Sequence, residues 1–393
     1  MLAVHFFNKY IPPAEYGLFT ALLSMLVMMQ IPAIGLQGVF AQQTASALSD
    51  EDQARLAATT RAVLAGTFAI WLVMVAVAFF WRQEILSTLK IRNPSALWIT
   101  FLLGLTALWS PIFTGILQGR QNFLWMGWGN LLSGVGRVSM IALFVVVLKT
   151  QATGMMAAVL CSALPVLAIY IWQSREVWSR AGTAFSWQSW MERVVPLTFG
   201  LGSSVFIFSV DNLWVRSVFP KEATGSYGAV ATVGRALVTF TAPIVAVMFP
   251  KIAASFAKSE KSNALGLTLA STAVLGALGV TGLAIFGGLL FRIVFPAYVG
   301  VASLSAFYAL CILPQALGNV LLNNLLAQSR FRVVPWVVLT AIAYFTALNL
   351  HHENFNRVII ILGIFSLIYF LLTLFFTWKP SATSAASTTN RDQ

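Results

Sequence analysis

The chain has 393 residues, of which 59% are hydrophobic and only 9% are charged, and its mean hydropathy is +0.82. These values exclude a water-soluble globular protein, and apolar runs of about 20 residues, long enough for a helix to cross the hydrocarbon core, recur along the sequence. The formal charge of +12 comes from 24 Lys and Arg residues scattered over many loops without a basic stripe, which does not indicate nucleic-acid binding. The composition predicts an all-α polytopic membrane protein.

The first half of the chain predicts a helix fragment and five complete spans. Residues 1–10 are apolar but too short to cross a bilayer, and they lack the basic start of a signal peptide, so they are typical of the end of a helix. In the polar segment after the first complete span, Ser49 is expected to cap a short helix with acids in its first turn. The complete spans are predicted at residues 16–36, 61–81, 96–118, 127–148 and 152–172.

The second half predicts a linker and six further spans. Residues 173–193 are rich in Trp and Arg, which predicts an amphipathic cytoplasmic linker on the membrane surface between an N-terminal lobe, 1–172, and a C-terminal lobe, 194–378. Residues 379–393 are small and polar and predict a disordered tail. The spans are predicted at residues 194–219, 227–249, 265–294, 303–327, 335–350 and 358–378.

The distribution of basic residues predicts the orientation in the membrane. With residues 1–10 counted as the first span, the even-numbered loops and the tail hold thirteen Lys and Arg residues and the odd-numbered loops hold eight. Basic loops stay in the cytoplasm, so the even loops and the C-terminus are expected there. The odd loop that carries Arg82, Lys90 and Arg92 is the exception.

Two matches along the chain indicate an internal repeat. Tyr16-Gly17 is followed by Pro32, and Tyr227-Gly228 is followed by Pro243, with the proline 16 residues after the tyrosine in both. The same offset of about 211 residues aligns Arg235 with Ser24. An independent echo pairs the QGR of residues 118–120 with the QSR of residues 328–330.

An offset near 211 residues contains six predicted spans, an even number, so both copies cross the membrane in the same direction. They are expected to form two six-helix lobes related by a pseudo-two-fold axis along the membrane normal, with a central cavity between them. Subtracting the offset from residue 194, where the seventh span begins, predicts that about 17 residues of the first helix lie before Met1. The alternative is a natural variant with eleven spans.

Charged residues inside apolar spans are candidates for function, because a charge at mid-membrane costs about 2.5–3.5 kcal/mol even on the lenient insertion scale. Asp211 and Arg235 are expected about 12 Å below the outer surface on adjacent helices, where they can form an ion pair that serves coupling or only fastens the hairpin. Arg216 lies closer to the end of its span and is expected to snorkel to the interface.

Arg137 lies near the middle of its predicted span, and no acidic residue occurs in the neighbouring spans of that lobe. Its guanidinium must face water or an anion, and its two-pronged donor geometry suits phosphate. Asn130, Asn212 and Asn319 are amides within spans that either contact sugar hydroxyls or bond between helices. The two cysteines and three histidines show no metal-ligand spacing, so no metal site and no cofactor are predicted.

Several stretches resemble the polysaccharide biosynthesis proteins, the oligosaccharide flippases of the MOP (multidrug/oligosaccharidyl-lipid/polysaccharide) exporter superfamily. The likeness covers nearly the whole chain through loose patterns. They are PAEYGLFTALLSM at residues 13–25, GILQGRQNF at 115–123, D-x-x-x-V-x-x-x-F at 211–219, GSYGAVATVGRALVTF at 225–240 and AVMFPKIA at 246–253.

The resemblance implies a flippase without enzymatic activity in the cytoplasmic membrane, with two six-helix lobes and a central cationic cavity. It would move an undecaprenyl-pyrophosphate-linked oligosaccharide between leaflets by alternating access, with polysaccharide assembly proteins as possible partners. Members of this family use cavity arginines to bind the pyrophosphate, and Arg137 and Arg235 are the positions of this chain that could do so. The alternatives are a cation-coupled exporter of small molecules or drugs that uses Asp211, and a membrane glycosyltransferase or polymerase, for which the outer loops offer mainly Glu84, Glu222 and Glu353.

Overall fold

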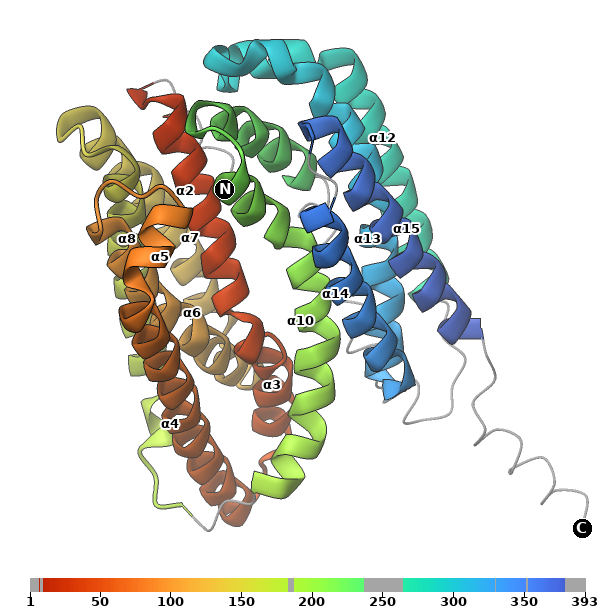
Figure 1. The fold of residues 1–393 in the computed structure, drawn as a ribbon. Coiled ribbons are helices and arrows are strands. Elements are labelled where there is room, and N and C mark those ends of the chain that lie inside the picture. The colour runs from red at the N-terminus through yellow and green to blue at the C-terminus, as the bar shows by residue number, and fades with distance from the viewer. Residues whose placement is uncertain are drawn as a thin grey trace, which may run out of the picture.

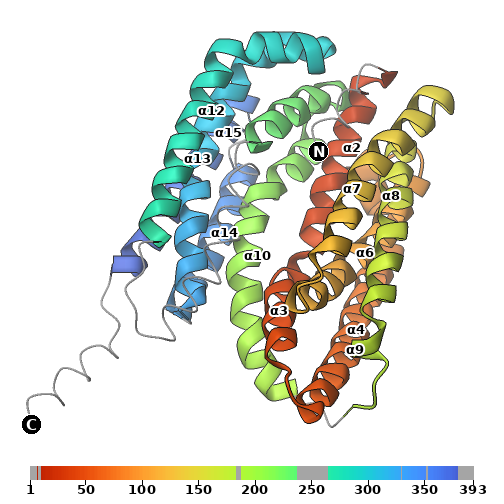
Figure 2. The ribbon, with the colours of Figure 1, turned by 180° about the vertical axis from the view of Figure 1, so that it is seen from behind.

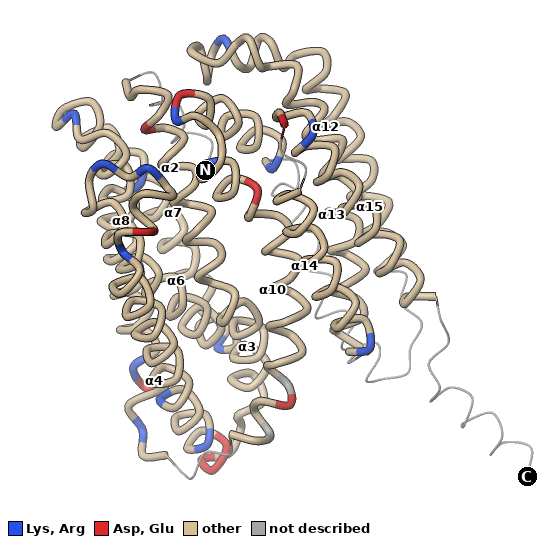
Figure 3. Tube along the Cα trace, viewed as in Figure 1, with Lys and Arg blue, Asp and Glu red and all other residues tan. Residues whose placement is uncertain are grey.

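In the computed structural model, residue 7 and residues 10–182, 187–236, 264–328, 330–350 and 353–378 are described. Within these residues the secondary structure is helical, and ten helices are long and apolar enough to cross a membrane. Lys, Arg, Asp and Glu gather mainly toward the two ends of the helices, and the middle of the bundle is almost uncharged (Figure 3). The chain is therefore an all-α, multi-pass membrane protein, as its composition predicts.

The helices pack as two lobes that lie side by side, with α10 between them (Figures 1 and 2). The N-lobe holds α2 (Pro13–Met29), α3 (Leu36–Ser46), α4 (Asp50–Phe80), α5 (Arg82–Thr88), α6 (Ser95–Gly119), α7 (Phe123–Ile141) with a π-helical end (Ala142–Val147), α8 (Gln151–Gln173) and α9 (Arg175–Trp178). The C-lobe holds α10 (Trp187–Val218), a helix over residues 221–236, α12 (Ala264–Val294), α13 (Ala302–Ala327), α14 (Val334–Leu350) and α15 (Phe355–Trp378).

Pro32 interrupts the first complete span, as the repeat predicts. A 3-10 turn, Ile31–Ala33, separates α2 from α3, because proline lacks the amide hydrogen that a continuous helix needs. The helix then resumes as α3, in residues expected to begin a polar loop. Its counterpart Pro243 lies outside the described residues.

The prediction of a short helix after Ser49 is wrong in length. Ser49 does cap the helix: its hydroxyl accepts a hydrogen bond from the Asp52 amide at 3.1 Å, and the Asp52 carboxylate accepts one from the Ser49 amide in return. The helix that starts there is α4, which continues to Phe80, since residues 53–62 contain no glycine or proline to end it.

The two lobes share an internal packing pattern, which supports the repeat. In the N-lobe α6 packs along α8, α4 lies against α6, and α7 lies against α8. In the C-lobe α13 packs along α15, α12 lies against α13, and α14 lies against α15. Helices at the same position in the two copies therefore have the same neighbours.

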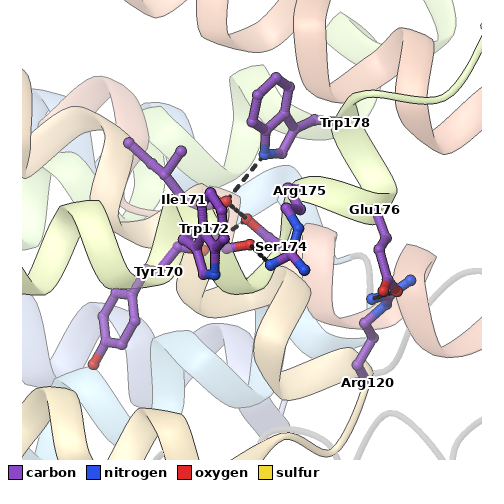
Figure 4. A network of polar contacts seen from close by, with 8 residues as sticks. All are labelled: Arg120, Tyr170, Ile171, Trp172, Ser174, Arg175, Glu176 and Trp178. Atoms are coloured by element: carbon purple, nitrogen blue, oxygen red, sulfur yellow. Dashed lines mark hydrogen bonds and ion pairs between the residues drawn. The ribbon is translucent and has the colours of Figure 1, made fainter.

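The arginines of the QGR and QSR echo follow the equivalent helices α6 and α13. Arg330 donates to the carbonyls of Phe376 and Thr377 at 2.7 and 3.1 Å, at the open end of α15. In the N-lobe, Ser174 and Trp178 satisfy the carbonyls at the end of α8, and Arg120 pairs with Glu176 at 3.0 Å instead (Figure 4). The continuation of the chain into α9 explains this difference.

The lobes differ at α7 and α14. In the C-lobe α14 packs along α10, where Trp214 donates to Asn349 at 3.2 Å. The described part of the N-lobe has no counterpart of α10. The apolar face of α7 is accordingly exposed: Leu124 is 68% exposed, Leu131 59% and Val135 64%.

A pair of glycines lets α6 approach α3 closely. A Cβ atom added at Gly115 would lie 2.5 Å from the Gln37 carbonyl oxygen, and one at Gly119 would lie 2.6 Å from the Ala41 carbonyl oxygen. Both neighbours are backbone atoms of a helix, which do not move aside as a side chain does. This G-x-x-x-G spacing is typical of close helix contacts in membranes.

Gly119→Ala is expected to destabilise the protein by about 1–3 kcal/mol, because the methyl group would overlap the α3 backbone. Gly38→Ala in α3 is the matched control: nothing lies within 4 Å of its added Cβ, and alanine favours the helix. The midpoint of thermal aggregation in detergent measures the stability of both variants. Equal midpoints for the two variants would contradict the close α3–α6 contact.

Candidate functional site

Asp211 lies at the centre of a buried polar cluster in the C-lobe. Its side chain is 0% exposed and accepts hydrogen bonds from Tyr227 at 2.7 Å and Tyr308 at 2.9 Å. Arg235 forms an ion pair with its other carboxylate oxygen, and the guanidinium carbon lies 5.3 Å from the centroid of the Phe208 ring. The ion pair expected from the sequence is therefore present. Three donors surround the carboxylate, as a charge removed from water requires.

The position of Arg235 differs from the prediction. The helix that carries it begins at residue 221, so its Cα lies about 21 Å along the axis from that end, whereas Asp211 lies about 10 Å from the end of α10. The Arg235 side chain spans this difference, because helical side chains point toward the N-terminus of their helix. The Cα atoms of the two residues thus lie at different depths, and the long arginine side chain brings the two charged groups into contact.

Arg137 lies in the interior of α7, about 21 Å along the helix from Phe123 and about 15 Å from Val147. Its Nε atom is buried, and its guanidinium has no hydrogen-bond or ion-pair partner among the described residues. Asn130 lies two turns before it on the same side of α7, about a quarter turn from Gly129 and Gly136, which face α8. The two residues form a polar stripe on an apolar helix.

The other two amides hold helices together. Asn212 is 6% exposed and donates to Ser24 at 3.2 Å, which joins α10 to α2 across the lobes. Asn319 accepts from Ser204 at 3.0 Å and from Tyr369 at 3.4 Å within the C-lobe. Both amides form inter-helix hydrogen bonds, and a contact of either one with a sugar remains a prediction.

Arg216 does not snorkel to the interface as expected. It is 2% exposed and donates to the Leu89 carbonyl at 2.9 Å and the Ala14 carbonyl at 3.0 Å, both in the N-lobe. The sequence places Arg216 only three residues before Phe219, and nothing in the pattern indicates that the end of α5 covers that position. Its partners lie about 130 and 200 residues away along the chain.

Comparison with known proteins identifies the fold. No protein-family model matches the chain, and no curated protein sequence matches it. Among solved structures, an inward-facing multidrug resistance MATE family transporter of the MOP superfamily has a TM-score of 0.77 at 10% identity, over 96% of this chain and 93% of that one. The lipid II flippase MurJ in an inward closed conformation has a TM-score of 0.71 at 12% identity, over 95% and 85%.

A third structure, an outward-facing MATE family transporter of the same superfamily, has a TM-score of 0.57 at 11% identity, over 96% of this chain and 94% of that one. The chain is therefore a multi-pass membrane protein with the fold of the MOP-superfamily transporters. The fold is common to MATE transporters and to MurJ, so it does not separate a drug exporter from a flippase.

Asp211→Asn is expected to destabilise the protein by about 3–5 kcal/mol, because it leaves Arg235 buried without its counter-charge. Arg235→Gln is expected to have a similar effect. The double variant, which has no charge left in this cluster, is expected to recover part of the loss. Thermal unfolding of the four proteins in detergent measures the coupling. Effects that simply add would show that the two charges do not stabilise each other.

Proposed function

We propose that this protein is a transporter that flips a polyprenyl-pyrophosphate-linked oligosaccharide, a precursor of a surface polysaccharide or O-antigen, across the cytoplasmic membrane by alternating access. The substrate would be held by its charged group, and no bond would be made or broken. The MOP-transporter fold supports transport, and the resemblance of the sequence motifs to oligosaccharide flippases supports the substrate class.

The observation that carries the proposal is the balance of charge inside the spans. Among the acidic residues that the structure describes, only Asp211 lies in the interior of a span, and its carboxylate is fully buried against Arg235 and two tyrosines. Arg137 carries a guanidinium without a partner among the described residues. Because Arg137 has no counter-charge and the carboxylate of Asp211 is already paired, the site favours an anionic substrate over a cationic one.

The two arginines would act in different ways. Arg137, with Asn130 two turns away, offers its donors directly, and its planar fork matches a phosphate group. Arg235 can bind a second phosphate only by exchanging Asp211 for it. In that exchange the substrate anion would replace the carboxylate as counter-charge, and Asp211 would become free to take a cation or a proton.

The conformation of the molecule fits the inward-facing state of such a cycle. The TM-score is higher against the inward-facing MATE transporter than against the outward-facing one, 0.77 against 0.57. The predicted outer end, where α2 begins and α10 ends, is closed by contacts between the lobes.

Arg137→Ala is expected to lower flipping at least about tenfold, the effect of losing one charge-assisted hydrogen bond to phosphate. Arg137→Lys should retain part of the activity, since it keeps the charge but not the fork. The measurement is movement of a polyprenyl-pyrophosphate oligosaccharide in proteoliposomes. Arg292→Ala, at the exposed end of α12, is the matched control for loss of a positive charge. Full activity of the Ala variant would remove Arg137 from the site.

The second candidate is a cation-coupled exporter of small molecules, which the fold similarity to MATE transporters supports. Its key residue would be Asp211, released from Arg235 by a cation. Drug resistance that depends on Asp211 and an ion gradient, but not on Arg137, would favour this exporter. Loss of lipid-linked oligosaccharide flipping in Arg137→Ala would favour the flippase.

A further inference from the structure

The lobes meet at the predicted outer end of the molecule, where α2 of the N-lobe crosses the helix over residues 221–236. A Cβ atom added at Gly17 would lie 2.7 Å from the Gly225 amide nitrogen, and one added at Gly225 would lie 2.4 Å from the Pro13 carbonyl oxygen. One turn deeper, a Cβ atom at Gly228 would lie 3.1 Å from the Cβ atom of Thr20. The absence of side chains at these glycines lets the two backbones touch across the lobes.

Arg216 crosses the same junction from the C-lobe. Its guanidinium donates to three N-lobe carbonyls, those of Ala14 at 3.0 Å, Leu89 at 2.9 Å and Lys90 at 3.3 Å. A fourth bond, to the Thr224 hydroxyl at 3.0 Å, ties it to its own lobe. Two of these carbonyls follow the last turn of α5, where helix carbonyls carry partial negative charge and lack partners within the helix.

Lys90 makes the reciprocal contact. It belongs to the N-lobe, and its ammonium donates to the carbonyl of Phe219, at the end of α10 in the C-lobe, at 2.6 Å. Burial and the nearby Arg216 lower the pKa of Lys90. Each lobe thus places one cation on backbone carbonyls of the other lobe.

We propose that Arg216 and Lys90 form a reversible clasp that keeps the outer end shut until the lobes separate. Both cations donate their hydrogen bonds to neutral carbonyls rather than to carboxylates, so none of these bonds is an ion pair that has to break when the clasp opens. Water can replace every one of these bonds, and Arg216 regains its hydration on exposure. The contacts are strong enough to close the buried junction and weak enough to exchange with water.

The clasp also explains the exception in the topology of the chain. Lys90 lies in the odd-numbered loop whose three basic residues contradict the prediction that basic loops stay in the cytoplasm. Because its charge binds the Phe219 carbonyl, this lysine serves the closed junction, and its position does not report the orientation of the loop.

The proposal rests on alternating access but not on the identity of the substrate, so its test uses no substrate. In a background with Cys161 and Cys311 changed to Ala, Ser24→Cys places a thiol on α2 beneath the junction, where Ser24 is 4% exposed. A membrane-impermeant maleimide added to intact cells should label it slowly. Glu353→Cys, at the exposed outer surface, should be labelled in every protein and verifies the orientation.

Adding Arg216→Ala is expected to raise the labelling rate of the Ser24→Cys thiol about tenfold. The variant loses the free energy of at least one charge-assisted hydrogen bond in the closed state, so the open state becomes more populated. Arg292→Ala, which removes a charge elsewhere on the same predicted side, should leave the rate unchanged. If Arg216→Ala does not accumulate in the membrane, Lys90→Asn removes only the reciprocal bond, and asparagine tolerates the φ of 53° found there.

A disulfide between Thr20→Cys and Gly228→Cys provides a second measurement, since the Cβ atoms at these positions lie close to the separation that a disulfide needs. Oxidation should link the pair readily in the parent protein and more slowly with Arg216→Ala. Unchanged labelling and unchanged cross-linking in both clasp variants, with the protein folded, would overturn the clasp. If the clasp variants change labelling and cross-linking as expected but the parent protein does not flip the oligosaccharide, that result would instead count against the proposed substrate.

Discussion

The cost of placing a charge inside a membrane governs this structure. Three arginines meet that cost in three ways. Arg235 forms an ion pair with a carboxylate. Arg216 donates hydrogen bonds to backbone carbonyls at the start of α2 and after α5, and Arg137 has no partner among the described residues. Because each buried guanidinium must replace its lost hydration, the partner that it has indicates what the residue can do. A satisfied ion pair fastens a lobe, carbonyl acceptors can exchange with water, and an unsatisfied guanidinium can bind an anion.

The internal repeat explains why α10 lies between the two lobes. The offset that aligns Arg235 with Ser24 places these residues at matching positions of α2 and of the helix over residues 221–236. Both contact α10 at consecutive residues: Arg235 binds Asp211, and Ser24 accepts from Asn212. One helix therefore lies between two equivalent helices. It is joined to the helix of its own lobe by an ion pair, whereas its bonds to α2, from Asn212 to Ser24 and from Arg216 to the Ala14 carbonyl, go to neutral acceptors. Water can replace neutral acceptors, so α10 can separate from α2 while it stays joined to its own lobe.

Much of the fold could be predicted because a bilayer imposes one length and one polarity on every span. The limits of α6, α8 and α13 differ by at most one residue from the apolar runs that predict them. The Asp211–Arg235 pair could also be predicted, because two buried charges on adjacent helices at reachable depths have few other partners. Polarity is a poor guide where helices leave the hydrocarbon, because α3 and the first turns of α4 are polar yet helical. The 3-10 turn with Pro32 precedes α3, and the Ser49 cap begins α4.

Arg216 could not be assigned in the same way, since its acceptors are backbone carbonyls. Any residue has a carbonyl, so no side-chain pattern marks Leu89 or Ala14 as a partner, and only the tertiary packing of α5 and α2 brings them near. The same feature separates the clasp from the ion pair. Asp211 and Arg235 both belong to the C-lobe and can move together without breaking, whereas every bond from Arg216 to a carbonyl crosses between lobes. Motion of the lobes must therefore break bonds at the outer junction, whereas it does not by itself require the Asp211–Arg235 pair to break.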